Sequence, residues 1–253
     1  NCPGGMLVFK NSPKSYKDLP LRVGELGTVH RQELSGVLGG LFRVIQFTQD
    51  DAHVFCCEED LEGELVKLIK FVDKVYKKFG FDYKVELSTR PDKRIGSDKI
   101  WDKSEAALKS VLKKQKMKFK INKGDGAFYG PKIDYHIKDS LGRTWQCGTI
   151  QLDFSMPERF DLTYKDKDNE LKRPIMIHRA IYGSLERFIG ILLEHTNGRL
   201  PFWLAPLQLR VINFTDKNNK ACNKLFKDLL DLGFRVDIDL SSDDLEQLLV
   251  DFL

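Results

Sequence analysis

Phe47-Thr48-Gln49-Asp50-Asp51-Ala52-His53 places four ionisable or amide side chains in the middle of an apolar region. An apolar run over 40–47 precedes it, and Val54-Phe55-Cys56-Cys57 follows it. The β-branched and aromatic residues on both sides predict a strand. Because side chains alternate between the two faces of a strand, Gln49, Asp51 and His53 share one face, and Asp50 and Ala52 the other. The stretch therefore predicts the floor of a polar pocket; the alternative is a strand that ends in a polar loop.

The composition is that of an ordinary globular protein. The chain has 253 residues, 31% charged and 42% hydrophobic, which suits one large domain or one large and one smaller domain. A net charge of +4 permits a nucleic-acid partner without requiring one. Five irregularly spaced cysteines argue against a disulfide framework, and no apolar run in the sequence reaches membrane-spanning length. We therefore expect a reducing compartment, the cytoplasm, and no membrane partner.

Hydrophobic periodicity predicts alternating strands and helices. Residues 28–33 and the strand that follows 40–47 are expected to form an antiparallel hairpin with a long connection. Residues 58–79, 100–114 and 179–194 have the spacing of amphipathic helices, and residues 83–89, 117–122, 132–137, 144–154 and 175–178 that of strands. After a linker at 201–206, the segments 207–213, 217–232 and 234–240 predict a β-α-β unit.

Two further segments offer ligand-binding chemistry without defining it. On the predicted helix, Ala180, Gly183 and Ser184 lie beside Arg187, so a carboxylate or phosphate could approach closely and meet a forked donor. A tight helix-packing face with a surface arginine is the alternative. The glycine-rich turn at 124–132 allows close backbone approach, but its spacing matches neither fingerprint of a nucleotide-binding loop.

Cysteine and histidine side chains supply candidate metal ligands. Cys2, His53 and His178 each lie beside a predicted strand or turn, and thiolate and imidazole suit Zn²⁺. Spacing alone does not single these residues out, because other histidines are equally available by count: His30, His136 and His195.

Six blocks of sequence occur in order and without large gaps: Asn1-Cys2-Pro3-Gly4, residues 26–33, 47–53, 126–132 and 146–154, and His178-Arg179-Ala180-Ile181-Tyr182-Gly183-Ser184-Leu185-Glu186-Arg187-Phe188. Together they resemble the catalytic core of the threonyl-tRNA synthetases, a class II aminoacyl-tRNA synthetase family. The resemblance implies an α+β fold: the class II antiparallel sheet flanked by helices in a catalytic core over 1–200, then the start of a smaller α/β anticodon-binding domain over 206–253. It also implies that the first motif of the family and an editing domain lie outside this sequence, and that the full-length protein is a homodimer.

The resemblance assigns one zinc ion to Cys2, His53 and His178. Three protein ligands leave a coordination position open, as in a working zinc site. In the family, the amino group and hydroxyl of threonine complete the sphere. Asp51 would accept a hydrogen bond from that hydroxyl, with Gln49 and Tyr129 lining the pocket. A site that binds the hydroxyl rejects valine far better than an apolar pocket could.

The same resemblance assigns an ATP site with Mg²⁺. Arg31 would bridge the threonine carboxylate and the α-phosphate, Glu33 would hold the adenine amino group, and Phe47 would stack on the adenine ring. Arg43 and Arg187 would hold the triphosphate. The remaining wall around adenylate and ribose would consist of Lys132, Gln146, Thr149, Gln151 and Ser184. No protein nucleophile is needed, and Arg31, Arg187 and Lys132 are expected to act by positioning and electrostatic stabilisation.

The implied function is ATP-dependent activation of L-threonine to threonyl-adenylate and its transfer to the 3′ end of threonine tRNA. The chain departs from the family pattern at three positions: Gly5 and Gly39, where histidine is usual, and Ile45, where arginine is usual. These departures motivate an alternative, a non-catalytic relative that binds threonine, adenylate or tRNA. A generic zinc hydrolase is a weaker alternative, because the sequence has no His-Glu-x-x-His helix.

Overall fold

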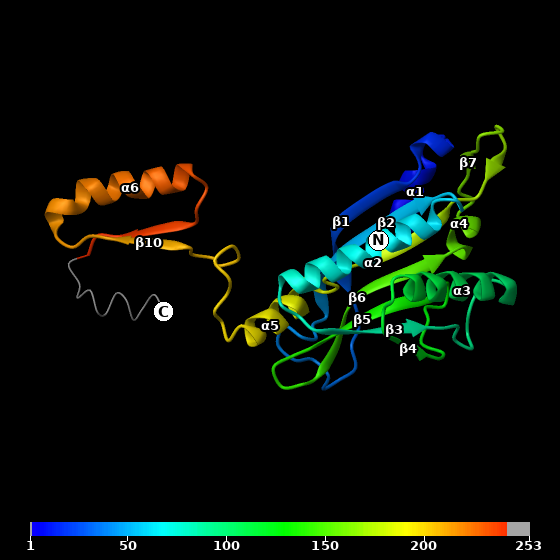
Figure 1. Ribbon diagram of the computed structural model, residues 1–253, viewed down its shortest axis with the longest axis horizontal. Helices are drawn as coiled ribbons and strands as arrows, with labels where there is room; N and C mark the ends of the chain where they lie inside the picture. Colours follow the sequence, from blue (N-terminus) through cyan, green and yellow to red (C-terminus); the bar gives the residue numbers. More distant parts are fainter. Residues whose placement is uncertain (1, 242–253) are drawn as a thin grey trace. The chain divides into compact units, whose positions relative to one another are not determined.

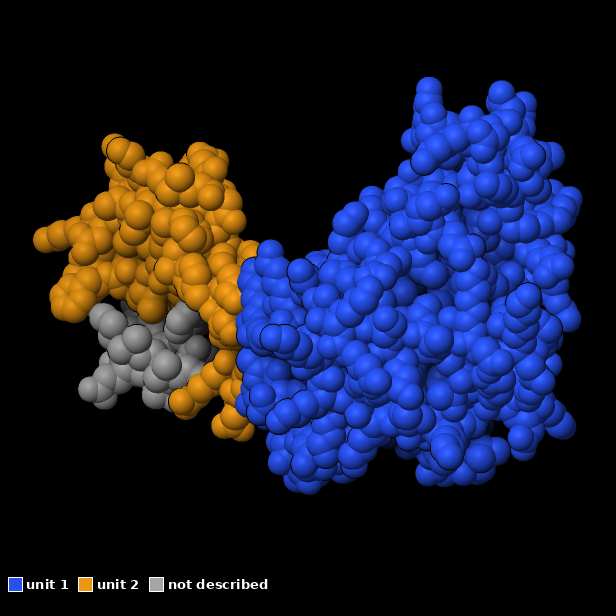
Figure 2. Space-filling model, turned by 45° about the vertical axis from the view of Figure 1, so that its right-hand side comes forward, with its two compact units in different colours: residues 1–195 blue, residues 196–253 orange. Residues whose placement is uncertain are grey.

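The computed structural model describes residues 2–241. The chain divides between His195 and Thr196 into two compact units, which are coloured separately in Figure 2. Among the helices of residues 2–241, none combines the length and the hydropathy needed to cross a membrane.

The first unit is built on a seven-stranded sheet (Figure 1). Its strand order is β1-β2-β9-β6-β5-β3-β4, and every neighbouring pair is antiparallel except β3 and β4. The strands, in chain order, are β1 Leu21–His30, β2 Gln46–Cys56, β3 Tyr83–Ser88, β4 Phe119–Asn122, β5 Lys132–Lys138, β6 Thr144–Asp153 and β9 Ile175–Ala180. A separate two-stranded ribbon joins β7 Tyr164–Lys165 and β8 Leu171–Lys172.

Helices α2 (Leu61–Lys78) and α3 (Asp98–Lys114) lie next to each other, in front of the sheet in the view of Figure 1. Both are amphipathic, so a stripe that includes Leu65, Val72 and Tyr76 on α2 is buried while the lysines remain in solvent. The ring of Tyr76 meets that of Tyr135 on β5 edge to face. One face of the sheet therefore packs against α2 and α3, and part of the opposite face carries polar side chains.

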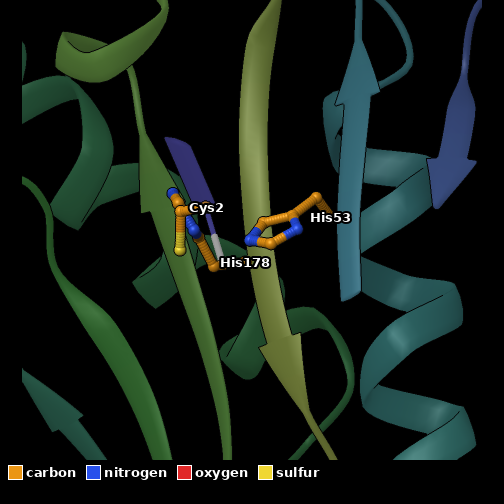
Figure 3. Close-up of side chains that lie close together, drawn as sticks. All are labelled: Cys2, His53 and His178. Atoms are coloured by element: carbon orange, nitrogen blue, oxygen red, sulfur yellow. The ribbon is translucent and has the colours of Figure 1, made fainter. Parts of the chain in front are cut away.

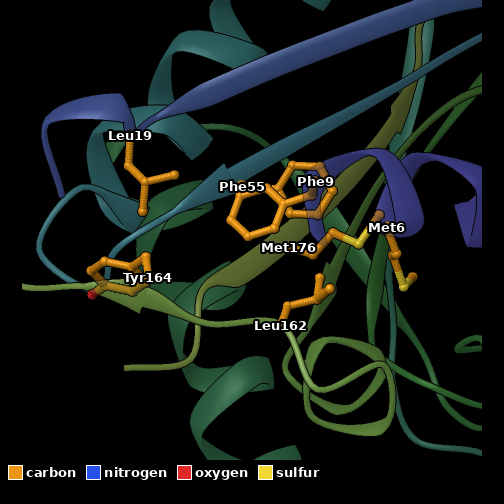
Figure 4. Packing of buried hydrophobic residues seen from close by; sticks show 7 residues of the cluster. All are labelled: Met6, Phe9, Leu19, Phe55, Leu162, Tyr164 and Met176. Atoms are coloured by element: carbon orange, nitrogen blue, oxygen red, sulfur yellow. The ribbon is translucent and has the colours of Figure 1, made fainter. Parts of the chain in front are cut away.

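Helix α1 (Cys2–Lys10) packs over β2 and β9 on that opposite face, in a small apolar core (Figure 4). The ring of Phe9 stacks on that of Phe55, with centroids 4.5 Å apart. The other buried members of this core are Met6, Leu19, Leu162, Tyr164 and Met176. Periodicity predicts no helix here, because Pro3, Gly4 and Gly5 lie in the first turn. Burial of Met6 and Phe9 outweighs the poor helix propensity of the glycines.

The predicted helix over 179–194 is wrong at its start. Residues up to Ala180 belong to strand β9, and helix α5 runs only over Leu185–His195. Between them Gly183 adopts φ +72°, a left-handed conformation that no α-helix contains. The predicted strand at 28–33 likewise ends at His30 and begins earlier, at Leu21. The hairpin itself is confirmed, since β1 and β2 pair antiparallel across the long connection 31–45.

The second unit contains a parallel pair of strands, β10 (Leu209–Ile212) and β11 (Val236–Asp239), joined through helix α6 (Asn219–Asp231). The predicted β-α-β unit is therefore present, with each element shorter than expected. Residues 242–253, the end of the expected anticodon-binding segment, lie outside the described residues. The remaining short elements are helix α4 (Ser155–Arg159) and the 3₁₀ turns Tyr16–Asp18 and Asp216–Asn218.

Candidate active site

A cavity of about 360 Å³ opens on the polar face of the sheet, over β2, β9 and β6. All the predicted site residues except His53 and Lys132 line it: Cys2, Arg31, Glu33, Arg43, Phe47, Gln49, Asp51, Tyr129, Gln146, Thr149, Gln151, His178, Ser184 and Arg187. The sequence reasoning gave no cavity-lining role to Val29, Phe42, Val44, Cys147 or Arg179. Phe47, Gln49 and Asp51 share one face of β2, as the alternation of the strand predicts. The stretch 47–53 therefore forms part of the cavity lining.

Cys2, His53 and His178 meet beside this cavity (Figure 3). One potential ligand atom of each lies within 4.8 Å of those of the other two. His53 and His178 are direct cross-strand neighbours in the β2–β9 ladder, and their ring centroids are 5.0 Å apart. Cys2 reaches them from the first turn of α1, which the small apolar core holds against β2 and β9. The three residues come from three distant parts of the sequence.

The nitrogen atoms of the two histidines fit a metal ion. Asp153 Oδ2 lies 2.9 Å from His178 Nε2 and fixes the orientation of that ring. His178 Nδ1 and His53 Nε2 are buried, and neither makes a hydrogen bond to any of the described residues. Buried polar atoms without partners are costly in a folded protein, and ligation of a metal would satisfy both of them.

The electrostatics of this cluster favour a thiolate. Burial raises the pKa of Cys2, but the adjacent imidazoles of His178 and His53 outweigh burial and lower it to about 6. Burial lowers the pKa of His178, but Asp153 and Cys2 outweigh that effect and raise it to about 9. A thiolate and two oriented imidazoles form a donor set that suits Zn²⁺.

Asp51 lies between the histidine cluster and the open cavity. Its Oδ1 is 3.6 Å from His53 Nε2, and burial raises its pKa. The ring of Tyr129 lies 5.0 Å from that of His178, and its hydroxyl donates to Gln151 Oε1. A small polar molecule bound at this end of the cavity would contact the Asp51 carboxylate and the cluster of Cys2, His53 and His178 together.

Three arginines line the cavity away from the cluster. Arg187 donates from Nε to the Phe42 carbonyl at 2.8 Å and from Nη1 to the Gln146 carbonyl at 3.1 Å, and it lies over the ring of Trp145. Burial lowers its pKa, and the neighbouring charges of Arg43 and Arg31 lower it further. Like charges gathered in one cavity without enough carboxylates to balance them indicate an anionic ligand.

Phe47 and Glu33 complete the arginine-lined end of the cavity. The guanidinium of Arg31 lies 5.3 Å from the centroid of the Phe47 ring. Glu33 Oε2 is 3.8 Å from Arg43 Nη1. The cavity therefore offers a ring for stacking, a carboxylate acceptor and several cationic donors within one wall, the set of groups that a nucleotide requires.

Asp50, to which sequence reasoning gave no role, shapes the wall from the opposite face of β2. Its carboxylate accepts hydrogen bonds from the backbone amides of Ile181, Tyr182 and Gly183 at 2.8–3.1 Å. These bonds hold the turn that brings Ser184 to the cavity. The signal in the sequence was that Asp50, the first of two adjacent aspartates, lies on the face of the strand opposite Gln49, Asp51 and His53.

Lys132 does not line the cavity. Its ammonium group is buried against Asp134 Oδ2 at 2.5 Å and Asp125 Oδ2 at 3.1 Å. Of the three departures from the expected pattern, Gly5 is nearest the cluster, since a Cβ added there would lie 3.6 Å from His53 Nδ1. Gly39 and Ile45 lie in the connection 31–45, and Ile45 is 53% exposed.

Comparison with known proteins identifies the family. Residues 1–196 match the family model of the tRNA synthetase class II core domain (G, H, P, S and T). The chain belongs to this family. The α+β fold class predicted from the sequence, an antiparallel sheet flanked by helices, is thereby confirmed.

Curated relatives and solved structures point to one branch of the class II synthetases. The chain is 57% identical over 94% of its length to threonine–tRNA ligase of Clostridium tetani, and 58% identical to that of Caldanaerobacter subterraneus subsp. tengcongensis. It is similar to the solved RNA binding domain of threonyl-tRNA synthetase from Cryptosporidium parvum Iowa II, with a TM-score of 0.95 and 44% identity, over all of this chain and 64% of that one.

A putative threonyl-tRNA synthetase from Aeropyrum pernix is also similar to this synthetase core, with a TM-score of 0.80 and 34% identity over all of the chain and 60% of the solved one. A prolyl-tRNA synthetase from Giardia lamblia, at 21% identity and a TM-score of 0.65, shares the fold. The chain spans 37% of the length of each of the two curated relatives named above.

Proposed function

We propose that this chain carries the threonine-activating site of a threonine–tRNA ligase. The supporting observation is the convergence of Cys2, His53 and His178 beside a cavity that also presents Arg31, Arg43 and Arg187. One side of the site suits a metal that reads a small amino acid, and the other suits a polyphosphate. The high identity to curated threonine–tRNA ligases supports threonine as that amino acid.

Cys2, His53 and His178 would hold a zinc ion. When bound, zinc supplies an open coordination position for the amino group and hydroxyl of threonine. Asp51 would accept a hydrogen bond from the threonine hydroxyl, and Asp153 keeps the ring of His178 in its ligating orientation. Gln49 and Tyr129 would close the pocket around the side chain.

Activation needs positioning and charge neutralisation. The threonine carboxylate attacks the α-phosphorus of ATP, a new phosphorus–oxygen bond forms, and pyrophosphate leaves. Arg31 would hold the carboxylate against the α-phosphate, while Arg43, Arg187 and Mg²⁺ brought with ATP neutralise the leaving group. Phe47 would stack on adenine and Glu33 would accept from its amino group. A ribose hydroxyl at the 3′ end of threonine tRNA then attacks the activated carbonyl, and AMP leaves.

We extend the proposal to the rest of the protein. Residues 1–200 would be the catalytic core, and residues 206–253 the start of an anticodon-binding domain, with the β10-α6-β11 unit as its described part. Threonine tRNA is the proposed macromolecular substrate, the full-length protein a homodimer, and the cytoplasm its location.

The test is threonine-dependent exchange of pyrophosphate into ATP by the full-length protein loaded with zinc. We expect exchange with threonine, and exchange with valine lower by at least about a hundredfold, because a site that binds a hydroxyl leaves polar groups unpaired with valine. Cys2→Ala should abolish bound zinc and exchange together. Cys222→Ala is the matched control, because that cysteine lies in the second unit and should retain both.

Absence of exchange by zinc-loaded, folded protein would contradict the proposal. Calorimetric binding of threonine and ATP without turnover would instead identify the non-catalytic relative that Gly5, Gly39 and Ile45 suggested. Equal exchange with threonine and valine would remove the role of zinc in choosing the amino acid.

A further inference from the structure

Asp134 lies directly behind the cavity wall, and its side chain is 1% exposed. Its carboxylate accepts from Gln146 Nε2 at 2.6 Å, from Thr149 Oγ1 at 3.2 Å and from Ser88 Oγ at 2.7 Å. The ammonium of Lys132 balances its charge. Four donors therefore converge on one buried carboxylate, and two of them, Gln146 and Thr149, line the cavity.

A β-bulge makes this convergence possible. Residues three apart on a regular strand lie on opposite faces, so Gln146 and Thr149 should not point the same way. In the β5–β6 ladder Thr149 is opposite Asp134 and Gln146 is opposite His136, with one extra residue on β6 between them. Gly148 lies in the bulge, where a Cβ would come within 2.6 Å of the Tyr76 hydroxyl. The bulge turns both side chains toward Asp134.

The consequence concerns the polarity of the wall. A carboxylate only accepts, so the Gln146 amide must give its NH₂ to Asp134 and turn its carbonyl oxygen away. Thr149 likewise donates its one hydroxyl proton to Asp134, so only the lone pairs of its oxygen remain for another hydrogen bond. Thr149 can therefore only accept a hydrogen bond from a ligand in the cavity. Gln146 presents its carbonyl oxygen as an acceptor and keeps one further N–H, in contrast to the arginines, which only donate.

We infer that Asp134 is a positioning residue that sets the Gln146–Thr149 wall to accept hydrogen bonds and thereby selects the ribose hydroxyls of the nucleotide. This inference rests on the proposed function, in which the ligand is ATP, whose ribose hydroxyls are its sugar donors. Phosphate oxygens, which only accept, find their donors at Arg31, Arg43 and Arg187 instead. The buried polar network thus orients the nucleotide without touching it.

The test compares ATP with its 2′-fluoro and 3′-fluoro deoxy analogues in pyrophosphate exchange by the full-length protein. Fluorine is close in size to a hydroxyl but cannot donate. The wild-type protein should prefer ATP over at least one analogue by about tenfold or more in kcat/KM. In Asp134→Asn the new amide NH₂ forces Gln146 or Thr149 to present a donor, so this preference should fall to less than about threefold.

Asp125→Asn is the matched control. Asp125 also contacts Lys132 and Ser88, but it touches neither Gln146 nor Thr149, so its variant should retain the preference. Gln146→Met and Thr149→Val, which remove the acceptors and leave Asp134 in place, decide the matter if Asp134→Asn does not fold. Folded Asp134→Asn with wild-type preference, or both wall variants with unchanged preference, would overturn the inference. Absence of any exchange by the wild-type protein would instead overturn the proposed function.

Discussion

At the scale of single residues, the candidate site depends on carboxylates that do not themselves line the cavity. Asp50 holds a turn, Asp134 fixes a wall, and Asp153 orients a histidine. All three are buried, and each accepts from several donors. A buried carboxylate is stable only when such donors surround it. The hydrogen bonds to these three aspartates therefore fix the positions of the groups around the cavity.

Asp153→Asn should weaken binding of the proposed metal by about 10–100-fold, because the ring of His178 loses the acceptor that fixes its orientation. The measurement is a competition titration of zinc against a chromogenic chelator. Asp166→Asn is the control: Asp166 is also buried and also accepts from two backbone amides in a turn, but it lies away from the cluster. Equal zinc affinity of the Asp153 variant and the wild-type protein would show that His178 needs no such support.

At the scale of elements, the decisive feature is the interruption between β9 and α5. The sequence 179–194 has helical periodicity, but the chain runs as a strand to Ala180, turns at Gly183 and becomes helical only at Leu185. The strand carries His178 to the cluster with Cys2 and His53, and the helix carries Arg187 to the arginine-lined end of the cavity. One continuous helix could not deliver both side chains.

Gly183→Ala should destabilise the first unit by about 2–3 kcal/mol. The residue needs φ +72°, and an added Cβ would lie 2.4 Å from the Cys147 carbonyl oxygen. Gly142→Ala measures the cost of the positive φ alone, because Gly142 also has a positive φ, of +78°, but its Cβ would meet nothing within 4 Å. That control should cost about 1 kcal/mol. Denaturant unfolding measures both, and equal costs would mean that the clash is relieved at no expense.

At the scale of the whole molecule, every residue that lines the cavity belongs to the first unit. The lining comes from α1, the connection 31–45, the strands, the turn with Tyr129, and the turn before α5 together with the start of that helix. The first and the last of these segments, α1 and the turn before α5, are more than a hundred residues apart along the chain. A ligand bound in the cavity would therefore contact segments that are brought together only by the tertiary fold.

A non-hydrolysable threonyl-adenylate analogue should slow amide hydrogen exchange in the connection 31–45 and in the turn at 181–184. It should leave β10, α6 and β11 unchanged, because ligand binding stabilises the segments that it contacts and the openings that expose them. Exchange followed by mass spectrometry checks this. Protection of residues 209–239 comparable to that of the connection would contradict the confinement of the site to the first unit.

The sequence by itself determined the strand at the centre, the hairpin, the amphipathic helices and the β-α-β unit, because hydrophobic periodicity and alternation are local properties. It also determined which face of β2 carries Gln49, Asp51 and His53. Its resemblance to a known family named fourteen of the twenty-one residues that line the cavity.

Only the tertiary structure decided the rest. Helix α1 forms against poor local propensity because Met6 and Phe9 are buried under it, and Lys132 is withdrawn from the cavity because Asp134 needs its charge. The β6 bulge and the turn at Gly183 depend on contacts with Tyr76 and the Cys147 carbonyl, which no local pattern contains. Local sequence patterns thus predicted the strands, the helices and the candidate side chains. Long-range packing decided which of those side chains reach the cavity.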